Sequence, residues 1–202
     1  MAPKRFHSIK SEIRVLAIDD GKFVPHTKGT VKVVGVVYRG AYYLEGVMQT
    51  EIAIDGLDAT EKMASMVKNS PYYGEIRVVV LDGVTFGGFN VVDVRKLSTL
   101  IELPVLTIVR KKPDLIEIEA ALKNLPDFET RWEAIKNAGN LFRVEVKPEL
   151  KPVYIQVAGI LFEDAEKILK KICVFSNIPE ALRAAHIIAS GLSLIQSKDL
   201  NY

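Results

Sequence analysis

Short runs of consecutive apolar residues punctuate this chain and predict its strands. The runs at 15–18, 78–81 and 104–109 are rich in Val, Leu and Ile, which is typical of strands buried on both faces. Two longer extended stretches, 30–38 and 41–54, flank Arg39-Gly40, a pair that predicts a turn. The first three strands are therefore expected to form an antiparallel meander.

Apolar residues at helical spacing predict the segments between and after these strands. A helix is expected to follow Asp58 and to stop before Asn69-Ser70-Pro71, where the Asn-Ser-Pro sequence breaks the pattern. The remaining predicted helices lie at 91–102, 114–125, 127–138, 162–173 and 179–196. The segments 143–146 and 153–157 are candidates for two extra short strands.

The order of these elements predicts an α/β fold that is ribonuclease H-like. A three-stranded antiparallel meander plus two parallel strands gives a five-stranded mixed sheet with helices on both faces. In this arrangement a right-handed crossover places the first and fourth strands side by side. Residues 1–202 are expected to form a single domain, with the polar, basic segment 1–11 as a loose N-terminal arm.

Composition restricts the compartment more than the function. The 202 residues contain 27 Lys and Arg against 25 Asp and Glu, a net charge of +2, which argues neither for nor against a nucleic-acid partner. Cys173 is the only cysteine, so no intrachain disulfide is possible. Without a signal peptide or an apolar run of about 20 residues, we expect a soluble cytoplasmic protein that does not bind a membrane.

The strands at 15–18 and 78–81 both end on acids, Asp19 and Asp82. Two carboxylates at the ends of adjacent strands repel each other unless one is protonated or a cation joins them. Mg²⁺ or Mn²⁺ prefers such oxygen ligands and supports phosphodiester cleavage. An Asp-Gly turn after a core strand is the alternative for Asp82, and both interpretations stay open.

Further residues are candidates for the same site. Asp55 is the preferred third acid, with Glu51 and Asp58 as alternatives and a turn role equally open. The last helix carries a polar stripe at spacings of three and four: Arg183, His186, Ser190 and Ser193. His186 is either near the metal or a hydrogen-bonded core histidine. The basic run Arg110-Lys111-Lys112 is either a solvated face or a phosphate contact.

Several segments, in the same order from about Arg14 to Leu192, resemble endonuclease V, and more closely its archaeal relatives with a domain of unknown function. The resembling segments are Ala17-Ile18-Asp19, Ile54-Asp55-Gly56, Val80-Leu81-Asp82-Gly83, 103–110 and 179–186. The resemblance implies that Asp19, Asp55 and Asp82 are metal ligands and that His186 approaches the metal. Asp55 would replace a glutamate and Arg110 an active-site lysine of that family.

The resemblance also has departures. Gly88-Phe89-Asn90 stands where endonuclease V has His-Pro-Arg, and the proline-tyrosine wedge that probes the damaged base is missing. We therefore expect a metal-dependent nuclease acting on RNA or DNA that is not a deoxyinosine-specific endonuclease. The alternative is a catalytically inactive nucleic-acid-binding or assembly protein on the same scaffold.

The loop after the central strand is the predicted substrate contact. Its glycines allow a backbone to approach a substrate closely. Together with a lysine of the basic run, the predicted contacts are Gly83, Gly87, Gly88, Asn90 and Lys111. The sequence does not indicate an oligomeric state.

Overall fold

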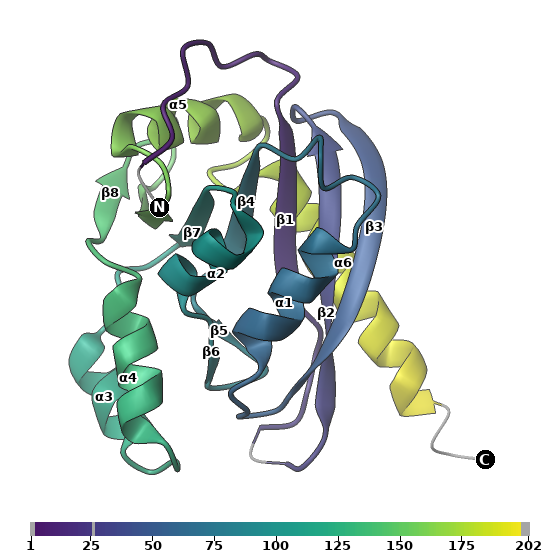
Figure 1. The fold of residues 1–202 in the computed structure, drawn as a ribbon, viewed down its shortest axis with the longest axis vertical. Coiled ribbons are helices and arrows are strands. Elements are labelled where there is room, and N and C mark those ends of the chain that lie inside the picture. Colours follow the sequence, from purple (N-terminus) through teal and green to yellow (C-terminus); the bar gives the residue numbers. More distant parts are fainter. Residues whose placement is uncertain (1–2, 26, 199–202) are drawn as a thin grey trace.

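A computed structural model describes residues 3–25 and 27–198 as one mixed sheet with helices on both faces (Figure 1). The sheet has seven strands in the order β3-β2-β1-β4-β7-β9-β8. These strands are β1 (Arg14–Asp20), β2 (Thr30–Arg39), β3 (Tyr43–Ala53), β4 (Val78–Asp82), β7 (Val105–Val109), β8 (Phe142–Val144) and β9 (Val153–Ala158). A separate small hairpin pairs β5 (Thr85–Phe86) with β6 (Asn90–Val91).

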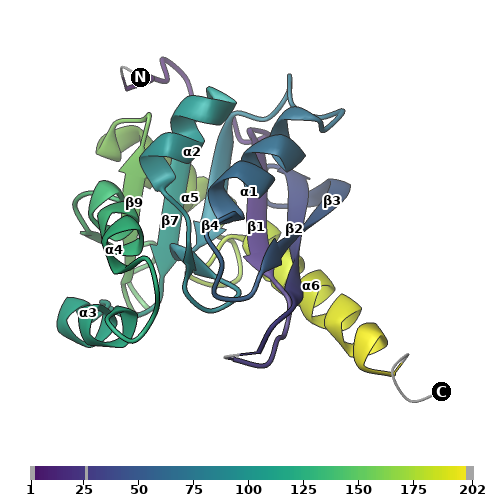
Figure 2. The ribbon, with the colours of Figure 1, turned by 60° about the horizontal axis from the view of Figure 1, so that its bottom comes forward.

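Six helices surround the sheet. They are α1 (Ala59–Lys68), α2 (Val94–Ile101), α3 (Leu115–Leu122), α4 (Phe128–Asn137), α5 (Phe162–Ile172) and α6 (Glu180–Lys198). Helices α1 and α2 cover one face, α5 and α6 cover the other, and α3 and α4 lie together at the β9 side (Figure 2). Within the described residues, no helix is long and apolar enough to cross a bilayer.

The prediction of five strands is wrong because β8 and β9 extend the sheet. β9 runs antiparallel to β7, and β8 runs antiparallel to β9. Val153 and Ile155 of β9 are fully buried, so β9 adds apolar side chains to the core. β9 also pairs with the backbone of β7, which would otherwise be an exposed edge strand. The predicted meander and the parallel pairing of β1 with β4 are confirmed.

Side-chain alternation along β1 divides the core into two layers. Leu16 and Ile18 pack in the cluster that contains α1 and α2, whereas Val15 and Ala17 pack in the cluster that contains α5 and α6. Because side chains of a strand point alternately to the two faces, Asp19 continues the α6 face and Asp20 continues the α1 face. The same alternation governs β4 and β7 and therefore decides which polar side chains meet.

The predicted loose arm is attached to the body of the protein. The Lys4 backbone N–H donates to the Gly159 carbonyl at 2.8 Å, and the Phe6 N–H donates to the Asp164 carboxylate of α5 at 2.9 Å. Phe6 and Ile9 also pack against the core cluster on the α5 side. Its only β-type pairing within the described residues is an isolated bridge between Lys4 and Ile160, so the segment is attached without being a strand of the sheet.

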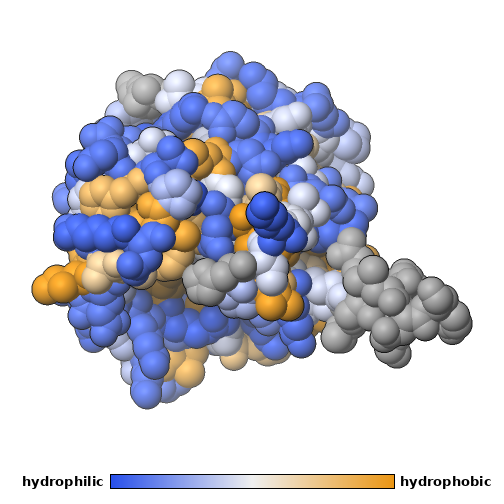
Figure 3. Space-filling model, turned by 90° about the horizontal axis from the view of Figure 1, so that it is seen from below, coloured by the Kyte–Doolittle hydropathy of each residue, from blue (hydrophilic) through white to orange (hydrophobic). Residues whose placement is uncertain are grey.

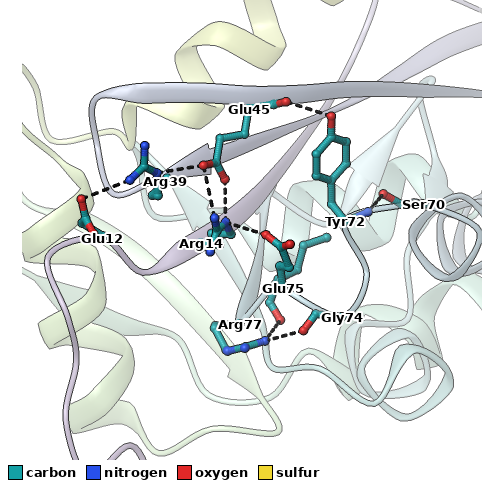
Figure 4. Close-up of polar contacts among 10 residues, drawn as sticks. Glu12, Arg14, Arg39, Glu45, Ser70, Tyr72, Gly74, Glu75 and Arg77 are labelled. Carbon is teal, nitrogen blue, oxygen red and sulfur yellow. Dashed lines mark hydrogen bonds and ion pairs between the residues drawn. The ribbon is translucent and has the colours of Figure 1, made fainter.

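At the end of the sheet where β1 begins, here called the amino edge, acidic and basic side chains form ion pairs (Figure 4). The Glu45 carboxylate lies between two guanidinium groups, 2.6 Å from Arg14 and 2.8 Å from Arg39. Arg14 also pairs with Glu75 at 2.9 Å, and the Tyr72 hydroxyl donates to the Glu45 carbonyl. This edge is thus a structural ion-pair network, and the opposite, carboxyl edge has a different charge arrangement.

Candidate functional site

Three strand ends meet at the carboxyl edge of the sheet, at the bottom of Figure 1. Ile18 of β1 pairs with Leu81 of β4, so the next residues, Asp19 and Asp82, lie side by side. Asp82 pairs with Ile108 of β7, and Arg110 comes two residues after Ile108. Alternation directs all three side chains to the face covered by α6. The prediction that Asp19 and Asp82 lie on neighbouring strands is confirmed.

These side chains line a cleft, here called the carboxylate cleft. Its main part has a volume of about 290 Å³ and is lined by Asp19, Asp20, Gly21, Lys22, Asp82, His186 and Ser190. An adjoining part of about 150 Å³ is lined by Asp82, Arg110, Arg183, His186 and three apolar residues. The structure thus brings together Asp19, Asp82, Arg110 and His186, which the sequence analysis selected separately.

Helix α6 carries His186 into the cleft. Ala185 and Ala189 of α6 are buried against Val34 and Val36 of β2, and these small side chains let the helix lie close to the sheet. The His186 Nδ1 atom is 2.8 Å from the Asp19 Oδ2 atom. Asp19 is buried and the imidazole of His186 is mostly exposed, so His186 is not the core histidine that was the alternative.

Burial raises the pKa values of Asp19 and Asp82, and the charges of neighbouring acids add to the shift of Asp19. Burial, followed by the charges of Asp82 and Asp20, raises the pKa of Asp19 to about 7, although the Asp20 N–H and His186 stabilise its ionised form. Burial also raises the pKa of Asp82, opposed by the charges of Arg110 and His186. Ionising Asp19 or Asp82 in the cleft is therefore less favourable than ionising a carboxyl in water.

Asp20 also lines the main part of the cleft, but one of its carboxylate oxygens is bound by the loop after β4. Its Oδ2 atom accepts a hydrogen bond from the Gly87 N–H at 2.6 Å, on the face toward α1. Burial raises the pKa of Asp20, and the Gly87 N–H opposes that shift. The sequence Asp19-Asp20 gives no sign of this division, and only the strand's alternation assigns the two acids to different faces.

Asp55 is held in a different network. Its Oδ1 atom accepts from the Phe89 N–H at 2.8 Å, and its backbone has a φ of 50°. The buried guanidinium of Arg131 donates to the carbonyls of Asp55, Gly56 and Phe89, which fixes this turn. Neither part of the carboxylate cleft includes Asp55 in its lining.

The alternative third acids also have structural partners. Glu51 accepts from Thr30 and Lys32 on the exposed side of the meander. Asp58 accepts from the Ala53 N–H and from the amide of Asn90. Within residues 3–25 and 27–198, no three His, Cys, Asp or Glu side chains are arranged to hold a metal ion.

Three of the predicted substrate contacts, Gly87, Gly88 and Asn90, have partners within the protein that shape the loop after β4. Asn90 is fully buried, and its amide bonds the backbone of Ala53 and Ala59. Gly87 bonds Asp20 and Asp55 through its backbone, and a Cβ on Gly88 would lie 2.2 Å from the Asp55 Oδ1 atom. These three residues shape the loop. Gly83 lines a cavity next to the cleft, while Lys111 is exposed beside Arg110.

The donor chemistry of Asp19 and Asp82 fits a hard divalent cation. Mg²⁺ commonly binds through one or two carboxylates together with water and substrate phosphates, rather than in a cage made only of protein ligands. Two repelling carboxylates with raised pKa values match that pattern. The four-residue ligand set predicted from the sequence, which included Asp55, is not assembled.

Comparison with known proteins identifies similar chains. A family model described as Endonuclease dU matches residues 11–193. A UPF0215 protein of Methanothermobacter thermautotrophicus is 48% identical over 199 residues, which cover 98% of this chain and 96% of that protein. A crystal structure of a protein of unknown function from Archaeoglobus fulgidus has a TM-score of 0.80 at 38% identity and covers 89% of this chain and 97% of its own.

A more distant similarity concerns the fold alone. Ciona intestinalis endonuclease V, solved with a 24mer DNA containing an inosine followed by a ribo-adenosine, has a TM-score of 0.61 at 15% identity. The match covers 91% of this chain and 86% of that one. The mixed α/β architecture is therefore that of endonuclease V, as the sequence segments implied.

The raised pKa of Asp19 predicts a pH-dependent stability in the absence of metal. An unfolded chain ionises Asp19 near its ordinary value of 3.8, whereas the folded state resists ionisation up to about pH 7. Stability is therefore full below about pH 4 and falls as the pH rises toward 7, by on the order of 4 kcal/mol for this group. Asp20 and Asp82 act in the same direction.

Urea unfolding across this pH range, with a chelator present, measures the effect. Asp19→Asn should lose much of the decline, because the neutral amide has no proton to release. Ser190→Ala, which lines the same cleft without an ionisable group, should keep the wild-type profile. Superimposable profiles for wild type and Asp19→Asn would show that Asp19 ionises normally.

Proposed function

The chain belongs to the Endonuclease dU family, and from this premise we propose that it is a nuclease that cleaves phosphodiester bonds of nucleic acid. The observation that carries the proposal is the pair of a buried Asp19 and a partly buried Asp82, side by side at the ends of two parallel strands. Two carboxylates that repel each other in a partly desolvated cleft lower the stability of the fold. Their position side by side therefore favours a functional explanation. The proposed cofactor is Mg²⁺ or Mn²⁺, held by Asp19 and Asp82.

A divalent ion at this position would neutralise phosphate charge and activate water as a nucleophile. Asp19 would do two things, because its Oδ2 atom also contacts His186 Nδ1. When Asp19 is ionised, that contact favours a proton on Nδ1 and leaves Nε2 as the free basic atom. His186, exposed on α6, is thus oriented to exchange a proton with a substrate or water in the cleft.

Arg110 and Arg183 supply positive charge on the other side of the cleft. Arg183 is engaged by Glu180 at 2.8 Å, whereas Arg110 acts mainly on Asp82 through its charge. A phosphate entering beside Arg110 would gain a guanidinium partner, which favours the charge that develops during phosphoryl transfer. Arginine replaces lysine of endonuclease V here with a wider, planar donor group.

A second candidate function is nucleic-acid binding without catalysis. One observation favours it: Asp55 lies in the loop network with Phe89 and Arg131 rather than in the carboxylate cleft. A scaffold with two of three expected acids would still present a cationic rim and a cleft to a phosphate backbone. Cleavage assays distinguish the two functions.

We predict that Asp82→Asn abolishes metal-dependent strand cleavage, with a loss of at least about a hundredfold, because it removes one of the two proposed ligands. The assay is cleavage of end-labelled single- and double-stranded DNA and RNA with Mg²⁺ or Mn²⁺. Glu51→Gln is the control, since Glu51 is an acid on the exposed side of the meander and lines neither part of the carboxylate cleft. It should retain most of the activity.

Full cleavage by Asp82→Asn, or an equal loss of cleavage in Asp82→Asn and the control variant, would remove the assignment of Asp82 as a ligand. Binding of nucleic acid by wild type without any cleavage in either metal would favour the second candidate function. Nuclease contamination is controlled by the variants themselves, because all three proteins pass through the same purification.

We further predict that an oligonucleotide with one deoxyuridine is cleaved at least about tenfold faster than one with deoxyinosine. The family description names dU, and Gly88-Phe89-Asn90 replaces the His-Pro-Arg of endonuclease V. A tenfold preference corresponds to about 1.4 kcal/mol of differential transition-state binding. The measurement compares initial rates on oligonucleotides that differ at one position. Equal rates, or faster cleavage beside deoxyinosine, would contradict this prediction.

A further inference from the structure

A groove lies at the amino edge, where the N-terminal arm passes over the starts of β1 and β4. The arm crosses the top of the molecule in Figure 1, and residues 4–8 and Lys10 line one part of the groove. Its volume is about 470 Å³, within the range of ligand pockets. The buried Ile13 and the half-buried Phe6 provide its apolar lining. We call it the arm groove.

The arm groove and the carboxylate cleft lie at opposite ends of β1. Arg14, the first residue of β1, lines the groove, and Asp19, near the end of that strand, lines the cleft. A strand rises about 3.3 Å per residue, so these two positions are roughly 17 Å apart. Figure 3 shows the carboxyl edge from below, with orange surface gathered on the α3 and α4 side, and the arm groove lies at the other end of the strands. A ligand therefore reaches both sites only if it is long.

The lining of the arm groove is strongly basic. It contains five lysine and arginine side chains and two glutamates. Both glutamates have arginine partners, since Glu12 lies 3.3 Å from Arg39 and Glu75 lies 2.9 Å from Arg14. Within residues 3–25 and 27–198, the other four lining cations are exposed and form no ion pair with a carboxylate: Lys4, Arg5, Lys10 and Arg77. The groove thus has an excess of positive charge that its own acids leave unpaired.

Backbone contacts hold the arm and thereby position its cations. The Lys4 N–H donates to the Gly159 carbonyl at 2.8 Å, and the Phe6 N–H donates to the Asp164 carboxylate at 2.9 Å. These two bonds lie on either side of Arg5. The Lys4 ammonium also lies 5.9 Å from the centroid of the Phe6 ring. The arm cations are therefore carried by a fixed segment of backbone.

Arg77, at the start of β4, is fixed through one of its nitrogens. Its Nη1 atom donates to the carbonyls of Gly74 and Ile76, at 2.9 Å and 3.2 Å (Figure 4). In the part of the chain that the structure describes, its Nε and Nη2 atoms make no hydrogen bond. An oriented guanidinium with free N–H groups is a suitable donor for a phosphate oxygen.

The cations are spread across several strands. Lys4 forms a bridge with Ile160, two residues beyond the end of β9, whereas Arg77 directly precedes β4 and Arg14 begins β1. In the sheet order β1-β4-β7-β9, the two outer strands are about 14 Å apart at the usual strand spacing. A single phosphate is too small to contact both ends of such a row. A chain of phosphates is long enough.

From these features we infer that the arm groove binds successive phosphates of a nucleic-acid backbone, at a distance from the carboxylate cleft. Guanidinium and ammonium groups bind phosphate oxygens through charge-assisted hydrogen bonds, and phosphate neutralisation also releases counterions. The inference rests on the proposed function for the identity of the polyanion. It makes the arm cations binding residues that set affinity and leave the chemical step unchanged.

The test variant is Arg5→Ala/Lys10→Ala, because both side chains are exposed and have no ion pair within the described residues. Affinity for a labelled mixed-sequence single-stranded DNA is measured by anisotropy at several salt concentrations, with a chelator present to prevent cleavage. The affinity of the variant should fall about tenfold or more. Its logarithmic salt dependence should be shallower by about 1.4, since each lost contact to a single-strand phosphate removes about 0.7.

Two further variants separate a local contact from a change in net charge. Lys62→Ala/Lys171→Ala removes the same charge from exposed lysines of α1 and α5 that line neither the arm groove nor the cleft. This control should bind like wild type with an unchanged salt dependence. Arg5→Lys/Lys10→Arg keeps both charges and should recover most of the affinity.

Inorganic tripolyphosphate distinguishes a nucleic-acid strand from a free polyphosphate. Titrated calorimetrically into the wild-type protein at the same salt concentration, it should bind at least about tenfold more weakly than the strand, because it neutralises fewer of the cations. Tripolyphosphate that binds as tightly as the strand, and loses its affinity in Arg5→Ala/Lys10→Ala, would make the groove a site for free polyphosphate. That result would overturn the inference.

Wild-type affinity and salt dependence in Arg5→Ala/Lys10→Ala would also overturn it, as would an equal loss of affinity in the Lys62→Ala/Lys171→Ala control. The outcome is separable from that of the nuclease proposal, because binding is measured without metal. Cleavage by a wild-type protein whose binding does not depend on Arg5 and Lys10 would remove the arm groove alone. Groove-dependent binding without cleavage would support the groove and remove the nuclease function. In an active enzyme, the test variant should raise KM and leave kcat unchanged.

Discussion

The repulsion between Asp19 and Asp82 is the constraint on which the functional interpretation depends. Parallel pairing of β1 with β4 sets the two acids at one edge, and alternation turns both toward α6. Burial then raises the pKa of each acid. At the amino edge, by contrast, Glu45 lies between Arg14 and Arg39. The charges of these three residues at the amino edge are therefore paired, whereas the two acids at the carboxyl edge share a cleft in which the proposed cation would relieve their repulsion.

The same edge joins the other features into one surface. Arg110 follows β7 into the cleft, and the lysines after it lead toward the cavity beneath α3 and α4. His186 reaches Asp19 only because alanines on α6 allow that helix to approach the sheet closely. The cleft, the run Arg110-Lys111-Lys112 and this cavity thus all lie where strands of the sheet end.

The sequence predicted the parts of the fold that depend on local pattern. Buried apolar runs and element order were sufficient for the meander, the parallel pairing and the meeting of Asp19 with Asp82. Asp55 and Asn90 were assigned to the site from spacing and resemblance, but loop hydrogen bonds and the buried Arg131 direct them elsewhere. The cavity between α3, α4 and β9 was missed because it depends on how these elements pack, which the local sequence pattern does not show.

The most direct test of the central claim is the melting temperature with and without millimolar Mn²⁺. If Asp19 and Asp82 hold the ion, Mn²⁺ should raise the melting temperature of wild type by several degrees. Asp82→Asn should melt at an unchanged or slightly higher temperature without metal, since one repelling charge is gone, and should show no response to Mn²⁺. An equal response to Mn²⁺ in both proteins would contradict the account.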